Sequence, residues 1–381
     1  MIAARLFPPE PAAAAYRLGA LAQALVARGA SVTALTTRPP QGDGSSWSRD
    51  GVLVRRWPVL RDAAGAVRGY VQFASFDGPL CFRLLFTPAP DVVVVEPPPT
   101  TGTVVRLVCG LRRVPYVYYA ADVSSTAAAG IGVAAPIVRV LRAVERWVLR
   151  GAAHVLAVSP GVAEEVQRLG VPAERVTMVG TGVDTDQFSP GVAATAASRT
   201  FVYAGTMSEI QGVEVFVRAF ARLAADDDAV ELVMLGGGAE APALRQMAEL
   251  LCPGRVRFEG LVDAARVAEE LRAARAGLAS VRPSRGYDFA YATKMFVSTA
   301  CGVPVVYAGV GPGRQLVVQH DLGWAADWDV DAVAQAMRQA LSSPSSASRR
   351  VRLAEWTRAN ASLTQVGERA ADAVLAQAKK R

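Results

Sequence analysis

Hydrophobic positions in the first half of the chain alternate between short continuous runs and stretches with a helical period. A strand is predicted over 1–7, a helix over 16–28 that ends at Gly29, and a second strand over 32–36. Further strands are predicted at 52–59, 91–95, 116–119 and 154–158, with helices ending near Leu111 and spanning 137–150. Strands that alternate with helices in this way are typical of a parallel, doubly wound sheet.

The pattern restarts after a segment rich in small residues. Ser189, Pro190 and Gly191 form a predicted turn, and small residues continue to Ser198. Strands are then predicted at 201–204, 230–235, 256–258 and 277–281, with helices at 213–223, 241–251 and 267–274. Glycines follow two of these strands, at Gly205 and at 236–238, where a nucleotide could approach the backbone. The second half therefore predicts a second doubly wound sheet.

The stretch 281–313 combines a strand end, a polar loop, a short helix and a new strand. Thr293 is a candidate N-cap for a helix with an inward face of Met295, Phe296 and Ala300, and Gly302 is a candidate left-handed stop before the strand 303–307. Lys294 then lies in the first helical turn, beside backbone N–H groups that can bind a phosphate or pyrophosphate. The alternative is that Lys294 is a solvated surface lysine.

Two polar side chains follow predicted strands of the first half. Glu96 begins the loop after 91–95, and Asp122 follows the strand 116–119. Open parallel sheets bind ligands at the carboxyl ends of their strands. Asp122 is therefore a candidate site residue, although it could equally be the N-cap of the next segment.

Length and charge narrow the choice of function. The 381 residues suit two domains, and 51% hydrophobic residues can build both cores. The formal net charge of +7 comes from 41 basic and 34 acidic residues, but basic runs with interleaved aromatics are absent, which argues against nucleic acid. The helix 137–150 carries four arginines, and we interpret them as a solvated face opposite Val140, Leu141, Val144 and Val148. Peripheral membrane contact stays open but is not indicated.

The positions of the cysteine, histidine and acidic residues in the sequence give little indication of a metal site. The four cysteines lie in apolar contexts without a C-x-x-C pair and suggest reduced core residues of a cytosolic protein: Cys81, Cys109, Cys252 and Cys301. His154 is interpreted as a core histidine, and the pair Asp184 and Asp186 as a chance occurrence more than a metal site. Because no signal peptide and no run of roughly 20 apolar residues is visible, we expect a cytoplasmic location.

Several motifs, in the right order, resemble family 4 retaining glycosyltransferases of the GT-B fold. The segments that carry this resemblance span nearly the whole chain: 7–10, 21–29, 158–160, 182–190, 203–206 with 211–212, 257–260, 293–294 and 300–306. The resemblance implies two Rossmann-like domains that face a central cleft, with the acceptor bound by the first and a nucleotide-sugar by the second. We predict the first domain over 1–190, a linker over 191–199, the second domain over 200–350 and a tail over 351–381 that crosses back to the first domain.

The resemblance also implies the site residues. Asp122 and Lys294 would be catalytic, with Lys294 neutralising the leaving pyrophosphate. Donor-binding positions would be Gly205, Thr206, Gln211, Gly236, Val262, Arg282, Arg285, Asp288, Phe289, Ala290, Tyr291, Thr293, Lys294 and Val297. Acceptor-binding positions would be Arg17, Glu96, Ala121 and Asp122. No metal and no cofactor is expected, and the co-substrate would be a nucleotide-sugar such as a GDP- or UDP-sugar.

Some positions depart from the family pattern. Val297 and Phe289 stand where many members carry two glutamates, and Gln211 and Thr206 stand where many carry lysine and arginine. Ala121 replaces a histidine, which suggests weak general-base demands, an inactive protein or an acceptor that is already acidic. A thiol is one such acceptor, so S-glycosylation is a specific hypothesis.

Three functions remain after these departures. The first is a retaining glycosyltransferase that acts on a small-molecule acceptor, as in natural-product biosynthesis. The second is a non-catalytic paralogue that binds a sugar nucleotide or a partner protein. The third is a sugar-nucleotide epimerase of the same fold, against which the scarcity of histidine counts. The sequence leaves the donor, the acceptor and the oligomeric state open.

Overall fold

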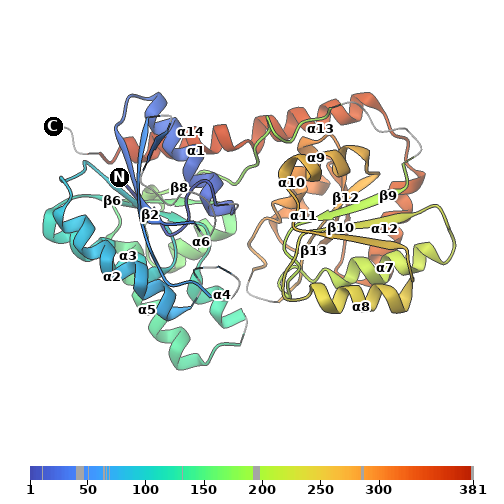
Figure 1. The fold of residues 1–381 in the computed structure, drawn as a ribbon, viewed down its shortest axis with the longest axis horizontal. Coiled ribbons are helices and arrows are strands. Elements are labelled where there is room, and N and C mark those ends of the chain that lie inside the picture. The colour runs from blue at the N-terminus through green and yellow to red at the C-terminus, as the bar shows by residue number, and fades with distance from the viewer. Residues whose placement is uncertain are drawn as a thin grey trace. The chain divides into compact units, whose positions relative to one another are not determined.

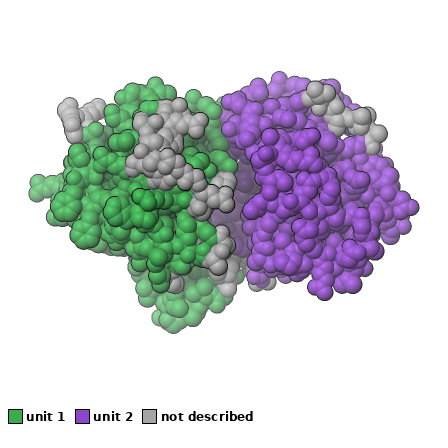
Figure 2. All heavy atoms as spheres, in the orientation of Figure 1, with its two compact units in different colours: residues 1–181, 363–381 green, residues 182–362 purple. Residues whose placement is uncertain are grey.

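The computed structural model describes residues 1–10, 12–39, 47–49, 51–62, 65, 67, 69–130, 132–191, 198–284 and 287–378. The chain forms two compact units, one from Met1–Thr181 with Leu363–Arg381 and the other from Gly182–Ser362 (Figures 1 and 2). The candidate residue Arg285 and most of the predicted linker 191–199 lie outside the described residues.

The first unit contains, within the described residues, an eight-stranded sheet in the order β3-β4-β2-β1-β5-β6-β7-β8. All neighbouring strands are parallel except β3, which is antiparallel to β4. The strands are β1 (Ile2–Ala3), β2 (Val32–Thr37), β3 (Trp47–Arg49), β4 (Val52–Trp57), β5 (Val93–Val95), β6 (Tyr116–Ala120), β7 (His154–Ala157) and β8 (Val176–Met178). Continuous apolar runs such as β5 and β6 are fully buried, as expected for a sheet covered on both faces.

Helices cover this sheet. They are α1 (Ala13–Ala27), α2 (Tyr70–Phe86), α3 (Pro99–Arg112), α4 (Ser124–Gly130), α5 (Ala135–Gly151), α6 (Pro160–Arg168) and α14 (Leu363–Leu375), with the short 3-10 helix η1 (Ala173–Arg175). The sequence pattern did not predict α2. His154, at the start of β7, is buried and bonds through Nε2 to Thr177 Oγ1 at 2.8 Å, which confirms its interpretation as a core histidine.

The second unit contains, over the part that the structure describes, a six-stranded parallel sheet in the order β11-β10-β9-β12-β13-β14. Its strands are β9 (Thr200–Ala204), β10 (Glu231–Leu235), β11 (Val256–Gly260), β12 (Ala276–Val281), β13 (Val305–Gly309) and β14 (Gly323–Ala326). Its helices are α7 (Glu214–Ala224), α8 (Ala241–Leu251), α9 (Ala264–Ala273), α10 (Lys294–Ala300), α11 (Pro312–Gln319), α12 (Val330–Ser342) and α13 (Ala347–Asn360). The prediction of two doubly wound Rossmann-like sheets is confirmed.

The boundaries of the two compact units along the sequence differ from the predicted domain boundaries. Residues 182–190 and 351–362 belong to the second unit, because Val183 bridges to Ser362 and its N–H donates to the Ala361 carbonyl at 2.9 Å. Helix α13 packs on α10 through the stacked rings of Phe296 and Trp356. The last helix, α14, packs against α1 in the first unit.

Candidate functional site

The second unit has a topological switch point between β9 and β12. These two strands are neighbours in the sheet, but the chain continues from them in opposite directions, to β10 and to β13. A crevice forms outside the carboxyl ends of such strands, and ligands bind there in open α/β sheets. Gly205 and Arg282 are the first residues after β9 and β12.

Glycines line this edge because the backbone turns are tight. Gly205 has φ +146° and its N–H donates to the Leu235 carbonyl at 2.9 Å. Gly236, after β10, has φ +120°, and a Cβ there would collide with the Gly205 carbonyl oxygen. A side chain at Gly205 would displace Lys294 and one at Gly236 would collide with backbone, so both loops expose backbone where a ligand could approach closely.

The side chain of Lys294 packs against the backbone of Gly205. Its Nζ donates to Gln211 Oε1 at 2.8 Å and is 5.4 Å from the centroid of the Tyr203 ring. A Cβ on Gly205 would be 2.5 Å from the Cε of Lys294, so the lysine stem occupies the space that the glycine leaves. Burial lowers the pKa of Lys294 to about 8, and no carboxylate among the described residues pairs with it. This half-buried ammonium does not fit the solvated surface lysine of the alternative interpretation.

The loop that carries Gln211 is held in place by three contacts. Ser280 Oγ donates to the Gln211 carbonyl at 2.6 Å, and the Arg282 N–H donates to the Ile210 carbonyl at 2.9 Å. Trp328 Nε1 donates to the Gly212 carbonyl at 3.0 Å. The Gln211 amide is therefore presented to Lys294 by a braced loop, which orients the ammonium.

Arg282 is already engaged by the protein. Its guanidinium pairs with Glu214 at 3.1 Å and lies 4.6 Å from the centroid of the Trp328 ring. Arg282 therefore lies at the predicted edge, but its charge is compensated there, unlike that of Lys294.

The start of α10 differs from the expectation. The helix begins directly after Thr293, as predicted, but Thr293 is in the right-handed helical region and makes no side-chain capping bond, so its predicted capping role is wrong. The N–H groups of Met295, Phe296 and Val297 donate to the carbonyls of Ala292 and Thr293. These three amides bond inside the turn, so the cation of Lys294 is the main feature of this helix start that could attract an anion. The predicted inward face of Met295, Phe296 and Ala300 is buried, and Gly302 has φ +72°, as expected.

The loop before α10 brings several predicted donor residues together. The Ser284 N–H donates to the Asp288 carboxylate at 3.0 Å, and the rings of Tyr287 and Phe289 stack with centroids 6.3 Å apart. Tyr291 packs on Phe296 with ring centroids 5.7 Å apart, and Ala290 is half-buried between Phe289 and Tyr291 along the chain.

An apolar wall stands where nucleoside contacts were expected. Val262 and Val297, far apart in sequence, pack against the same buried cluster, which includes Val202 and Leu235. The neighbouring Asp263 caps α9 by accepting the Arg266 N–H at 2.8 Å. Thr206 is exposed, and its carbonyl accepts the Tyr203 hydroxyl at 2.6 Å.

The first unit has its own switch point, between β1 and β5. Arg17 and Glu96 form a buried ion pair there at 2.9 Å, and Arg17 lies 5.1 Å from the centroid of the Tyr119 ring. Arg5, which follows β1, donates to the carbonyls of Val67 and Pro97 at 3.1 and 3.2 Å. Burial raises the pKa of Glu96, and Arg17 opposes that rise. Arg17 and Glu96 thus compensate each other, and backbone carbonyls hold Arg5.

Asp122 lies at the end of β6, at the same edge. Its Oδ1 accepts the Ser124 hydroxyl at 3.4 Å, and burial raises the pKa of its carboxyl group. The start of α4 is capped instead by Glu145 of α5, whose two oxygens accept the N–H groups of Ser124 and Ser125 at 2.7 and 3.0 Å. The N-cap alternative for Asp122 is therefore wrong. Ala121 is half-buried beside it.

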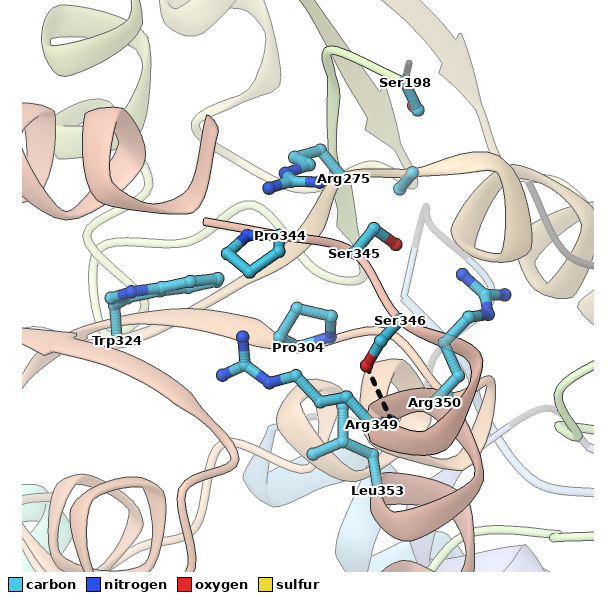
Figure 3. Close-up of a pocket in the computed structure, with 12 residues that line it drawn as sticks. Ser198, Arg275, Pro304, Trp324, Pro344, Ser345, Ser346, Arg349, Arg350 and Leu353 are labelled. Atoms are coloured by element: carbon cyan, nitrogen blue, oxygen red, sulfur yellow. Dashed lines mark hydrogen bonds between the residues drawn. The ribbon is translucent and has the colours of Figure 1, made fainter. Parts of the chain in front are cut away.

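A small pocket elsewhere in the second unit is a poor candidate for a ligand site. Figure 3 shows it at the amino ends of the strands, near Arg275 and Pro304, which precede β12 and β13. Its volume of about 30 Å³ holds about one water molecule. Arg275 donates to the Ala340 carbonyl at 2.6 Å and Arg350 to the Cys301 carbonyl at 3.4 Å, so these guanidiniums satisfy backbone groups.

No group of three or more histidine, cysteine or acidic side chains in the described parts of the chain could hold a metal ion. Asp184 Oδ1 accepts the N–H groups of Asp186 and Gln187 at 3.0 Å, so the acidic pair shapes a turn. Nor is any helix in those parts long and apolar enough to cross a membrane.

Two family models match consecutive parts of this chain. Residues 13–182 match the glycosyl transferase 4-like domain, and residues 198–343 match the glycosyl transferases group 1. Together the two matches span most of the chain, and they support a glycosyltransferase of the family 4 type. The prediction of the family from the ordered motifs is confirmed.

Curated relatives of this glycosyltransferase match over part of their length. The D-inositol 3-phosphate glycosyltransferase of Xylanimonas cellulosilytica is 33% identical over 203 residues, which are 48% of this chain and 47% of the relative. The glycogen synthase of Mycobacterium tuberculosis is 27% identical over 223 residues, 57% of this chain and 52% of the relative. The chain thus spans about half the length of the curated relatives it matches.

Solved structures match over nearly the whole fold. HepE of Anabaena in complex with UDP-glucose has a TM-score of 0.71 at 15% identity, covering 98% of this chain and 99% of HepE. WaaG, a glycosyltransferase involved in lipopolysaccharide biosynthesis, has a TM-score of 0.72 at 18% identity, covering 98% of this chain and 99% of WaaG. At these identities the likeness shows the fold, and the GT-B prediction is confirmed.

Proposed function

We propose that this protein transfers a sugar from a nucleotide-sugar to an acceptor, with retention of configuration at the anomeric carbon. The observation that carries the proposal is the ammonium of Lys294, which has no carboxylate partner among the described residues and lies over Gly205 at the switch point of the second unit. Negative charge develops on the diphosphate as the glycosidic bond breaks. A preoriented cation at that point stabilises the leaving group.

The donor would lie along the glycine loops of the second unit. The backbone at Gly205 and Gly236 can approach a diphosphate closely, and the apolar wall of Val262 and Val297 offers a dry surface for the nucleoside. A UDP- or GDP-sugar is the donor class that we test first, because HepE was solved with UDP-glucose. Nothing in this mechanism requires a metal ion.

The acceptor would be bound by the first unit and carry little charge. Arg17 is neutralised by Glu96, so this edge offers hydrogen bonds more than net charge. The Nε of Arg17 and the hydroxyl of Tyr119 are buried and have no hydrogen-bond partner among the described residues. A polar small molecule that reaches these two groups could form hydrogen bonds with them through its hydroxyl groups. Asp122, with its raised pKa, would exchange a proton with the acceptor.

A thiol acceptor would need the least help from a base. Its thiolate is populated near neutral pH far more than any sugar alkoxide. Because Ala121 supplies no imidazole beside Asp122, we include thiols with alcohols in the acceptor screen. S-glycosylation is supported if thiols react faster than matched alcohols with the same donor.

The test is thermal protection followed by turnover. We expect one member of a panel of UDP-, GDP-, dTDP- and ADP-sugars to raise the melting temperature, since a ligand that binds only the folded state stabilises it. The protecting donor is then incubated with alcohol and thiol acceptors, and the anomeric configuration of the product is read by NMR. An inverted product would overturn the retaining mechanism.

A second function is favoured by one observation. Val297 packs half-buried against an apolar cluster and Phe289 stacks on Tyr287, and neither apolar side chain offers a carboxylate to a sugar nucleotide. A non-catalytic paralogue would show donor protection without turnover for any acceptor, or no protection by any nucleotide-sugar. Either result would replace the transferase proposal.

A further inference from the structure

Helices α2, α3 and α5 form one layer on the first unit. Helix α3 packs against both α2 and α5, and Figure 1 shows the three side by side. Their outward positions include large apolar side chains that the protein leaves exposed: Phe82, Phe86, Leu107, Leu111, Val140 and Trp147. Phe86 is 83% exposed. We call the outward side of these helices the α2/α3/α5 face. Apolar side chains gathered in this way usually mark an interaction surface.

The sequence pattern assigned Val140 to the buried side of α5, and that assignment is wrong. Val140 is 66% exposed, whereas Val138, Glu145, Val148 and Leu149 are the buried positions. Helix α5 packs on α3 and α4, and its buried positions form a narrow stripe. Val140, Ala143 and Trp147 are exposed on the outer side of α5, which also carries the arginines of this helix.

The charge of the α2/α3/α5 face has one sign. The three helices contain seven arginines and only two carboxylates, Asp77 and Glu145. Both carboxylates are buried and bonded inward, Asp77 to Thr101 and Glu145 to the start of α4. The helices therefore present arginine to solvent without any acidic side chain of their own to balance it.

Most of these arginines converge on a groove. Arg106, Arg139, Arg142, Arg146 and Arg150 line it together with Trp147, and its volume is about 660 Å³. Arg106 lies 4.0 Å from the centroid of the Trp147 ring. Arg168 at the rim pairs with Glu164 and Glu165. No ion pair engages the other five guanidiniums within the described chain. Arg139, Arg142, Arg146 and Arg150 are exposed and available to anions outside it, whereas Nη1 of Arg106 is buried.

We propose that the α2/α3/α5 face docks on an anionic lipid bilayer. Phenylalanine, leucine, valine and tryptophan side chains can enter the boundary between headgroups and acyl chains, while arginines bind headgroup phosphates. Each arginine near an anionic leaflet adds attraction, so the charges and the apolar side chains act in the same direction.

Two other occupants fit the face less well. A second copy of the chain related by a two-fold axis would bring the arginines of one face against those of the other. A nucleic acid would pair with the arginines but would leave Phe82, Phe86 and Leu111 uncovered, since its binding is dominated by phosphate contacts. Both are outcomes of the experiment.

The experiment is sedimentation of the full chain with vesicles. We expect binding to phosphatidylcholine vesicles containing about a third phosphatidylglycerol, weaker binding to pure phosphatidylcholine, and release by salt. The variant Arg142→Glu/Arg146→Glu should lower partitioning at least about tenfold. The matched control is Arg218→Glu/Arg358→Glu, which changes the net charge equally through exposed positions on α7 and α13 and should bind like the wild type. Phe86→Ser should lower partitioning severalfold, because it removes inserted apolar surface.

Several outcomes would overturn the proposal. Among them are equal losses in the control and test variants, binding that ignores the lipid charge, and a preference for a DNA duplex over anionic vesicles at the same salt. Concentration-dependent dimerisation that Arg142→Glu/Arg146→Glu abolishes would assign the face to a second copy instead. Melting curves verify that each variant is folded. Protection by nucleotide-sugars should not change in any of them, so the result is independent of the proposed activity.

Discussion

Both units have a switch point at the carboxyl edge of their sheet, but the charged side chains at the two edges have different partners. At the switch point of the first unit, Arg17 pairs with Glu96 and Arg5 donates to two backbone carbonyls. At the switch point of the second unit, glycines line the edge and Lys294 has a neutral amide as its hydrogen-bond partner. A charge that the fold itself compensates contributes to stability, whereas a charge without a counter-ion is available to a ligand.

This contrast separates two measurable quantities. Removing a charge from the first edge leaves its partner buried and should lower the free energy of unfolding. Removing the charge from the second edge relieves a burial cost and should affect donor binding instead. The two edges can therefore be told apart by measuring stability and donor affinity on the same variants.

The largest effect is expected for Arg17→Met. Glu96 would keep a buried charge without its partner, and the free energy of unfolding should fall by about 3 to 5 kcal/mol. Urea denaturation measures the change. The double variant Arg17→Met/Glu96→Gln should recover part of the loss, because it removes the stranded carboxylate. A single variant that loses less than about 1 kcal/mol would mean that the pair is not structural.

Lys294→Met should lower activity and donor binding without lowering the stability of the free protein. Loss of the ammonium should lower turnover about 100-fold, the magnitude typical of removing one group that stabilises transition-state charge. Protection by the donor should disappear, while the melting temperature of the free protein stays level or rises. Arg358→Met, at an exposed position of α13, is the control and should change neither quantity. Undiminished donor protection in Lys294→Met would refute the assignment of this cation to the donor.

Gly205→Ala tests how the cation is positioned. The new Cβ would be 2.5 Å from Lys294 Cε, and φ is +146°. The lysine must move, so donor affinity should fall about tenfold and stability by about 1 to 3 kcal/mol. Gly237→Ala is the matched control on the neighbouring loop, because a Cβ there meets nothing within 4 Å. Isothermal titration with the protecting donor gives both affinities, and equal effects in the two variants would argue against this geometry.

Local features of the fold were well predicted from the sequence. Glycine stops, buried apolar runs and the restart of the pattern after Ser198 are properties of neighbouring residues, and they predicted both sheets and the edge at Gly205. Lys294 was found through the expected start of α10, and the helix does begin at Lys294 although Thr293 makes no capping bond. These signals need no knowledge of tertiary packing.

Features that depend on distant partners could not be predicted in this way. Glu145 caps α4 from 20 residues away, and its only signal was one acidic residue among the arginines of α5. The Arg17 and Glu96 pair joins residues 79 positions apart. The exposure of Val140 depends on which side of α5 packs against α3 and α4, and periodicity alone does not give that side. In each case the deciding contact is tertiary.

The smallest expected effect is a pH dependence of donor binding above about pH 8, which we assign to Lys294 at the second edge. Burial lowers the pKa of Lys294 from 10.5 to about 8. Between these values the folded protein has released the proton that the unfolded chain still holds, so the contribution of this group to stability rises with pH. Donor binding needs the ammonium, so affinity should fall severalfold as pH rises above about 8. In Lys294→Arg, whose guanidinium stays charged, the remaining affinity should be flat over that range. A decline of equal size in both proteins would place the titrating group elsewhere, and the contrast between the two edges would then lose its electrostatic basis.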